Sequence, residues 1–181
     1  MDVIGPIKPS TSNGHRFILV AIDYFNKWVE VFSHKSVIKK VVTDFVRNNI
    51  VCRFGIPNSI ITHNGDNLNS GLMHEICEKF QIIHHNSTPY RPQMTGAVEA
   101  ANKNIKIILR KMIDNYKHLH ENLPFSLIGY RTTIRTSTGE TPYLLVYGTE
   151  GVLPMEVEIP SLRIIQEAEL SDAKWIQSRY E

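Results

Sequence analysis

Apolar and polar positions follow two different periods along the chain, and this change of period separates predicted strands from predicted helices. Residues 17–22 form a continuous apolar run of strand length, which is typical of a strand buried on both faces. Shorter strand patterns at 3–7 and 28–32 lie on either side of it along the chain. The turn residues between these runs predict three strands in an antiparallel meander.

Helical spacing takes over after the third predicted strand. Apolar side chains recur there at intervals of three and four, at Ile38, Val41, Val42, Phe45 and Val46. We expect Ser36 to cap this helix and Gly55 with Pro57 to end it. Two further strands, at 59–62 and 81–85, enclose a helix at about 70–79.

The second half of the chain is predicted to be mainly helical. A long helix at about 97–117 is followed by shorter helices near 123–132 and 142–147 and an acidic helix near 164–180. Three strands, helix, strand, helix, strand and then helices is the element order of an α/β fold of the ribonuclease-H-like type. We therefore expect a mixed five-stranded sheet flanked by helices, with a C-terminal helical extension.

Composition narrows the class of protein. The 181 residues are 42% hydrophobic and 21% charged, as in an ordinary globular domain. The longest apolar runs are far shorter than the roughly 20 residues that a membrane span needs, so no membrane partner is expected. Cys52 and Cys77 are the two cysteines, too few for a disulfide framework and without the paired spacings of a structural zinc site.

Charge is distributed unevenly between the two ends of the chain. Residues 1–150 carry 17 basic and 12 acidic side chains, whereas residues 151–181 carry 3 basic and 6 acidic ones. We interpret 1–150 as the main domain and 151–181 as an acidic, partly helical extension. The basic part is the candidate for binding a polyanion, although a solvated surface of mixed charge would look similar.

Three residues that can carry chemistry converge in the expected fold. Asp2 begins the first predicted strand, and His63 follows the fourth, at the strand end where open sheets place their sites. Glu99 lies in the first turn of the long predicted helix, with 35 residues between it and His63.

These positions lie within blocks that resemble the catalytic core of retroviral-type integrases, most closely those of plant gypsy-type long-terminal-repeat retrotransposons. The blocks are VAIDYFNKWVEVF, FGIPNSIITHNGDNLNS, TPYRPQMTGAVEAANK and GYRTTIRTSTGETPYLLVYG. The family pattern is an Asp on the first strand, a second Asp before Asn-Gly, and a Glu about 35 residues later. The resemblance implies DNA integration, in which the family processes the 3′ ends of the element's DNA and transfers them to target DNA. It also implies that Asp2 and Glu99 are catalytic metal ligands for Mg²⁺ or Mn²⁺.

The chain departs from the family at one decisive position, because His63 stands where the second Asp is expected. An imidazole removes a negative charge and an oxygen ligand from a site that serves a hard, oxygen-preferring cation. We therefore expect weakened metal binding and impaired catalysis. Asp66 is the nearest carboxylate and is not expected to compensate, and Asp23 is expected to stabilise the turn after the second strand.

The long predicted helix also carries a basic stripe beside Glu99. Lys103, Lys106 and Arg110 follow it at offsets of 4, 7 and 11, opposite the apolar face. By resemblance Lys103 and Lys106 match positions that contact DNA, and Arg110 continues the same stripe. Tyr90, Arg91 and Gln93 in the preceding loop are further candidates for DNA contact. The alternative is a solvated helix face with Glu–Lys pairs.

The interpretation is therefore an integrase core that binds DNA and whose ancestral reaction is impaired. A catalytically dead DNA-binding or oligomerisation module is the main alternative, and a structure-specific nuclease of the same fold is a weaker one. The resemblance further implies a homodimer and a nuclear location, with DNA rather than a small molecule as the substrate.

Overall fold

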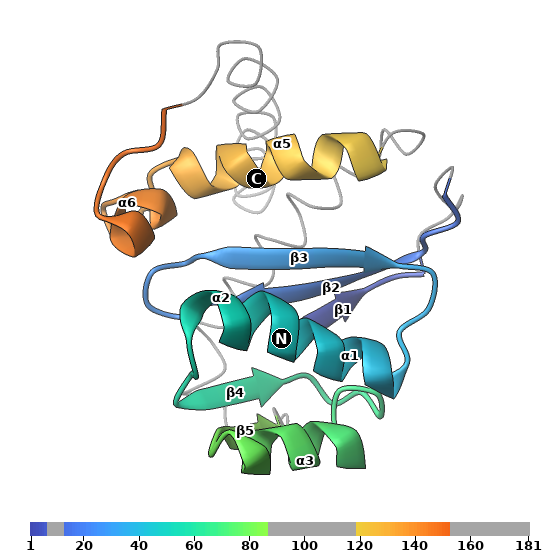
Figure 1. Cartoon of the computed structure of the whole chain (residues 1–181). Helices are drawn as coiled ribbons and strands as arrows, with labels where there is room; N and C mark the ends of the chain where they lie inside the picture. The colour runs from blue at the N-terminus through green and yellow to red at the C-terminus, as the bar shows by residue number, and fades with distance from the viewer. Residues whose placement is uncertain (7–12, 87–118, 153–181) are drawn as a thin grey trace, which may run out of the picture. The chain divides into compact units, whose positions relative to one another are not determined.

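The computed structural model describes residues 1–6, 13–86 and 119–152 (Figure 1). The chain forms two compact units. Unit 1 comprises Met1–Ile22 and Glu30–Ala100, and unit 2 comprises Asp23–Val29 and Ala101–Glu181. The predicted helices at 97–117 and 164–180, and nearly all of the predicted extension at 151–181, lie outside the described residues.

The first three strands form the predicted meander, in the order β1 (Asp2–Ile4), β2 (Phe17–Ile22) and β3 (Val29–His34). β1 and β2 pair antiparallel, with Asp2 opposite Val20. β1 ends earlier than the apolar pattern predicts, because Gly5 adopts a φ of 141° before Pro6. A side chain at Gly5 would lie 2.7 Å from the carbonyl oxygen of Arg16, so this close approach requires glycine.

The last two strands form a parallel pair, β4 (Ser59–Thr62) and β5 (Ile83–Asn86). Two backbone hydrogen bonds join this pair to the meander. The nitrogen of Met1 donates to the carbonyl of Ile61 at 2.6 Å, and the amide of His63 donates to the carbonyl of Met1 at 3.2 Å. This is the bonding pattern of parallel neighbours, so β4 runs alongside β1 in the same direction. The five expected strands are thus present, as a three-stranded and a two-stranded sheet linked through Met1.

The helical segment after β3 runs without interruption through three elements, α1 (Lys39–Phe45), the π-helical η1 (Val46–Val51) and α2 (Cys52–Phe54). Gly55 ends it with a φ of 86°, as predicted. The expectation that Ser36 caps it was wrong. The N-cap is Ile38, with no side-chain hydrogen bond, because the helix begins three residues after Ser36.

The other helix of unit 1 agrees closely with the sequence pattern. α3 spans Gly71–Lys79, and the Ser70 hydroxyl accepts a hydrogen bond from the Met73 amide at 3.4 Å. Its apolar face and that of α1 pack against one face of the strands. The buried core between them comprises Leu19, Ala21, Val42, Phe45, Val46, Ile60, Leu68, Met73, Ile76, Cys77 and Ile82.

Unit 2 contains α5 (Leu119–Thr132) and α6 (Pro142–Tyr147), in agreement with the two predicted helices. The Arg131 guanidinium lies over the Trp28 ring at 4.1 Å from its centroid and donates to the Val29 carbonyl at 2.7 Å. Tyr143 and Tyr147 pack around the same indole. Within the described part of the chain, no helix has both the length and the apolar content to span a bilayer.

Candidate active site

Asp2 lies on the face of the strands that is turned away from α1 and α3. Its neighbours Met1 and Val3 pack against the core beneath those helices, and side chains alternate between faces along a strand. Asp2 is nevertheless buried, at 6% exposure, and its Oδ1 accepts a hydrogen bond from the Val3 amide at 2.8 Å. The carboxylate is therefore held close to the backbone of its own strand.

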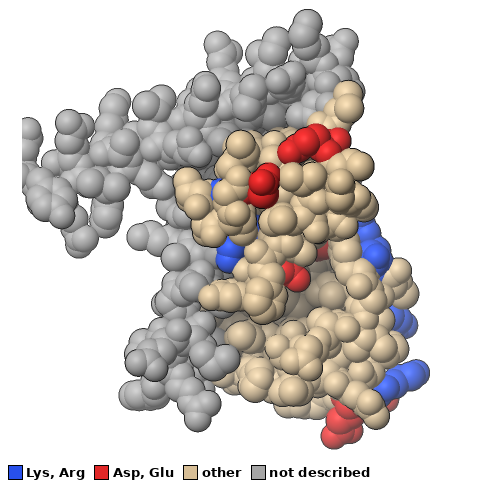
Figure 2. All heavy atoms as spheres, turned by 90° about the vertical axis from the view of Figure 1, so that its left-hand side faces the viewer, with Lys and Arg blue, Asp and Glu red and all other residues tan. Residues whose placement is uncertain are grey.

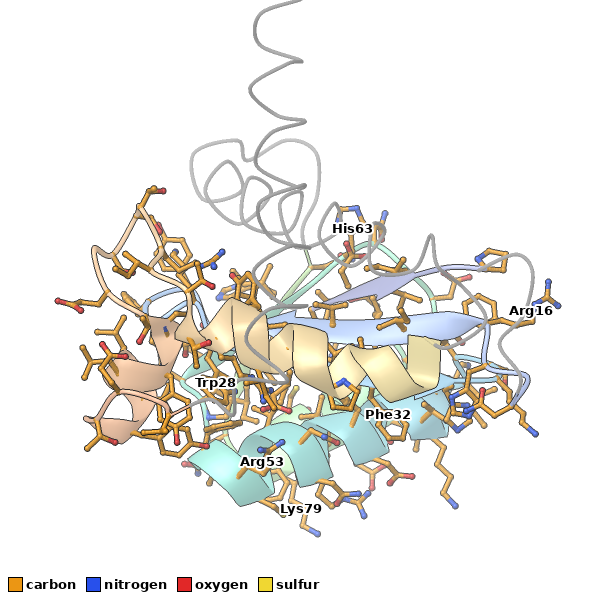
Figure 3. All side chains as sticks on the ribbon, turned by 90° about the horizontal axis from the view of Figure 1, so that it is seen from above. Arg16, Trp28, Phe32, Arg53, His63 and Lys79 are labelled. Carbon is orange, nitrogen blue, oxygen red and sulfur yellow. The ribbon has the colours of Figure 1, made fainter. Side chains whose placement is uncertain are left out.

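His63 is the neighbour of Asp2 on the adjacent strand. The two hydrogen bonds of Met1 align Met1 with Thr62, so the next residues along, Asp2 and His63, are also aligned. Adjacent strands lie about 4.8 Å apart. Alternation from Ile60, which is in the core, places His63 on the face that carries Asp2. The His63 side chain is exposed, and Figure 3 shows it on the opposite side of the sheet from Arg53 and Lys79.

The loop after His63 is fixed by hydrogen bonds to two carbonyl groups. The Gly65 amide and the Asn69 Nδ2 both donate to the His63 carbonyl, at 2.8 and 3.0 Å. The Gly65 carbonyl accepts from the amides of Leu68 and Asn69 and from Asn69 Nδ2. At the tip, Asn86 Nδ2 donates to Asn64 Oδ1 at 3.2 Å. The direction in which His63 leaves β4 is therefore set by this loop.

A buried threonine connects that loop to β5. The Thr62 hydroxyl has no exposed surface and lies 2.7 Å from Asn69 Oδ1 and 2.9 Å from His84 Nε2. A hydroxyl has one hydrogen, so donating to Asn69 requires it to accept from His84, which fixes the hydrogen of His84 on Nε2. We call Thr62, Asn69 and His84 the loop anchor. Sequence reasoning missed it, although a threonine at the end of a buried strand, followed by Asn just before a helix cap, is a usable signal.

The electrostatics around His84 favour its neutral form. Burial lowers the pKa of His84 from its usual 6.5, and the charges of His74 and His85 lower it further. The ring centroids of His74 and His84 are 5.0 Å apart in an edge-on arrangement. The hydrogen on Nε2 that the Thr62 hydroxyl requires is present in one tautomer of this neutral ring.

The donor set at the aligned pair does not fit Mg²⁺. That ion requires oxygen ligands in near-octahedral geometry, whereas the pair offers one carboxylate and one imidazole. Asp66 is exposed, in the turn that follows Gly65, and is not aligned with Asp2. The described residues contain no cluster of three or more histidine, cysteine, aspartate or glutamate side chains placed to hold a metal ion.

The other predicted site residues lie outside the described residues. These are Tyr90, Gln93, Glu99, Lys103, Lys106 and Arg110. The structure therefore brings together two of the three predicted positions, Asp2 and His63. The prediction for Asp23 is confirmed, since its Oδ1 accepts hydrogen bonds from the amides of Phe25 and Asn26 at 2.8 and 3.0 Å and so stabilises the turn.

Comparison with known proteins shows the family of the chain. The family model described as integrase core domain matches residues 1–92. The chain is 34% identical over 137 residues to a Pol polyprotein of Radiation murine leukemia virus, and 29% identical over 140 residues to a Gag-Pol polyprotein of Avian reticuloendotheliosis virus. These alignments cover 75% and 77% of this chain but only 23% and 12% of the polyproteins.

Solved structures show the same fold. The catalytic core domain of BIV integrase superposes with a TM-score of 0.61 at 19% identity, covering 81% of this chain and 92% of that one. A chain of the simian T-cell lymphotropic virus intasome, solved with the PP2A regulatory subunit B56 gamma, gives 0.62 at 22% identity, covering 84% of this chain and 56% of that one. The fold is that of an integrase catalytic core of the ribonuclease-H-like type. The chain belongs to the integrase core domain family.

Proposed function

We propose that this chain is a DNA-binding integrase core whose metal-dependent strand transfer is impaired by His63. The observation that carries the proposal is the alignment of Asp2 and His63 on adjacent parallel strands in an integrase core fold. In this position His63 replaces an oxygen ligand and a negative charge with a nitrogen donor. The further assignment to plant gypsy-type retrotransposons is supported by the sequence blocks quoted above.

Two carboxylates of the ancestral set remain in the proposed site. The first carboxylate is that of Asp2, which the structure describes, and the second is that of Glu99, which lies outside the described residues. Because the described donors do not fit Mg²⁺, no reaction step is assigned to a bound ion here. The surviving activity of the chain is then the binding of DNA at this face.

The DNA contacts belong to the segment that follows β5. We assign phosphate contacts to Lys103, Lys106 and Arg110, and contacts nearer the DNA end to Tyr90 and Gln93. In this proposal residues 1–150 form the core and 151–181 an acidic extension that does not contact DNA. A homodimer and a nuclear location complete the proposal by analogy with the family.

A strand-transfer assay with Mg²⁺ and with Mn²⁺, on the full chain and its His63→Asp variant, tests the proposal. We expect both proteins to bind the DNA substrate and only His63→Asp to form joined product. Equal product from both would contradict the impairment. DNA binding without product from either would favour the alternative, a DNA-binding module that is no longer catalytic.

A further inference from the structure

Unit 1 carries a group of basic side chains at the end of the meander where β1 and β3 end and β2 begins. This edge cluster comprises His15, Arg16, His34, Lys35, Lys39 and Lys40. Its residues come from the start of β2, the end of β3 and the first turn of α1. The segments that contribute them, 13–22 and 31–43, contain no aspartate or glutamate.

Contacts between the chain segments hold this cluster together. The Arg16 amide donates to the His34 carbonyl at 3.0 Å, and the rings of His15 and His34 stack with centroids 6.1 Å apart. The Lys35 side chain packs beside Gly14, with its Cε 3.7 Å from where a Cβ on that glycine would lie. Lys39 and Lys40 follow Lys35 within one short connection. The cluster is thus a continuous surface rather than scattered charges.

The exposed cations of the edge cluster have no carboxylate partner among the described residues of unit 1. Arg16, Lys35, Lys39 and Lys40 are exposed, and no carboxylate of the described residues lies within ion-pair distance of them. The ion pairs of this unit lie elsewhere, between Arg47 and Asp44 and between Arg53 and Glu30. Figure 3 shows Arg16 projecting from the sheet edge, far from Arg53 and Lys79.

Helix stability does not account for these lysines. α1 has no acidic residue in its first turn and has Lys39 and Lys40 there instead. Positive charge near a helix N-terminus opposes the helix dipole and destabilises the helix slightly. The lysines therefore add positive potential to this edge at a small loss of stability. Figure 2, which views the opposite end, shows mostly uncharged described side chains with lysine and arginine at the margins.

The edge cluster is within reach of nucleic acid that occupies the Asp2 face. Asp2 is level with Val20 on β2, and Arg16 lies four residues before Val20, directly before the strand begins. At about 3.4 Å per residue this is roughly 14 Å along the strand, which matches about four nucleotides of one DNA strand. A phosphate backbone that passes Asp2 toward the carboxyl ends of the strands would next meet these cations.

We infer that the edge cluster binds the phosphate backbone of DNA a few nucleotides away from the segment held at Asp2 and His63. The inference rests on the proposed function, because it extends the DNA path of that same site. It assigns the contacts to backbone rather than bases, since lysine at an open surface attracts phosphate without reading sequence. It concerns residues that are distant in sequence from the basic stripe proposed at Lys103, Lys106 and Arg110.

The test compares two double variants of equal charge on the full chain. Lys35→Ala/Lys39→Ala removes two exposed cations from the edge cluster, and Arg47→Ala/Lys79→Ala removes two exposed cations outside it. Binding of a labelled DNA duplex is measured by fluorescence anisotropy at several salt concentrations. Each lost phosphate contact lowers the salt slope of log K by about 0.9. We expect the affinity of the edge variant for DNA to fall roughly tenfold and its salt slope to fall by about one to two units. The affinity and salt slope of the control variant should stay near those of the wild type.

The outcomes separate this inference from the proposed function. Equal loss in both variants would show a net-charge effect and overturn the edge cluster. Unchanged DNA binding by the edge variant would also overturn the role of the edge cluster. If the wild type binds DNA in that case, the proposed function still stands. Failure of the wild-type chain to bind DNA at low salt would overturn both. Recovery of affinity in Lys35→Arg/Lys39→Arg would confirm that the charge itself is needed.

Discussion

The backbone amide of His63 donates a hydrogen bond to the carbonyl oxygen of Met1 at 3.2 Å, and this bond brings β4 alongside β1. Asp2 and His63 become aligned neighbours as a result, although 60 residues separate them in sequence. A carboxylate and an imidazole therefore lie side by side at the place where the proposed function expects two carboxylates. The predictions below test the structure that holds this pair and the chemistry that the pair allows.

The loop anchor predicts that Thr62→Val lowers the free energy of unfolding substantially. Valine fills nearly the same volume but removes the hydroxyl that lies 2.7 Å from Asn69 and 2.9 Å from His84. Two half-buried polar groups then lose a partner, which costs about 1–3 kcal/mol of unfolding free energy. Urea denaturation followed by circular dichroism measures this.

Thr43→Val is the matched control for that measurement. Thr43 is also buried, but its hydroxyl donates to the Lys40 carbonyl within the same helix at 2.9 Å. A helix does not depend on such a side-chain bond, so we expect a change of no more than about 0.5 kcal/mol. Similar losses in both variants would show that Thr62 has no special role.

The lowered pKa of His84 predicts a pH dependence of stability. Because burial lowers the pKa below 6.5, the unfolded chain takes up a proton before the folded chain does as the pH falls. The contribution of the neutral His84 ring to the free energy of unfolding is therefore complete above about pH 6.5 and is lost progressively below it. His84→Gln keeps a nitrogen donor for Thr62 but cannot titrate.

Unfolding free energies between pH 7.5 and 5 test this difference. We expect the wild type to lose stability more steeply than His84→Gln, with His74 and His85 present in both proteins. Parallel curves would mean that the folded protein accepts a proton on His84 at no cost.

The ion pair of Arg53 and Glu30 predicts that replacing Arg53 lowers the free energy of unfolding more than replacing Arg47 does. Arg53 lies 2.8 Å from Glu30, which is buried on β3, so Arg53→Met removes this ion pair from a buried carboxylate. Because the Arg53 side chain is 44% exposed, water compensates in part, and we expect a loss of about 1–2 kcal/mol. Arg47→Met breaks an exposed pair with Asp44 and should cost less than about 0.5 kcal/mol. Chemical denaturation of both variants measures the difference, and equal costs would contradict the role of burial.

The packing of Arg131 on Trp28 predicts that lysine cannot replace this arginine. The guanidinium covers the ring and donates to the Val29 carbonyl through both Nε and a terminal nitrogen, at 3.2 and 2.7 Å. Lysine keeps the charge but has no planar group for both interactions. We expect Arg131→Lys to lose about 1–2 kcal/mol and the tryptophan fluorescence to shift toward that of exposed indole. A variant with unchanged stability and emission would show that charge alone is sufficient.

Sequence patterns predicted the elements well where local signals were strong. The apolar run at 17–22 and the run at 59–62 became strands with those bounds, and Ser70 capped α3 because hydroxyl, spacing and apolar periodicity agreed. Ser36 also has a hydroxyl, but it does not lie directly before the first turn, and the helix begins three residues beyond it, at Lys39. The location of His63 after β4 could also be predicted from the motif around it.

The features that escaped prediction depend on contacts between distant segments. The loop anchor requires β5 to align His84 with Ile60, so that its ring reaches Thr62, and no local pattern contains that register. The edge cluster forms because β2 and β3 bring Arg16 to His34. Spacing along one element reveals a basic stripe on a helix, but it does not reveal a surface assembled from three elements.

Binding of Mn²⁺ to the wild type and to His63→Asp, measured by the electron paramagnetic resonance of the free ion, tests the central claim most directly. Restoring a carboxylate beside Asp2 supplies the missing oxygen ligand and charge, so we expect affinity to rise by at least about tenfold. Asp66→Asn serves as the control and should leave the wild-type affinity unchanged. Equal Mn²⁺ affinity in the wild type and His63→Asp would contradict the claim that His63 disables the site.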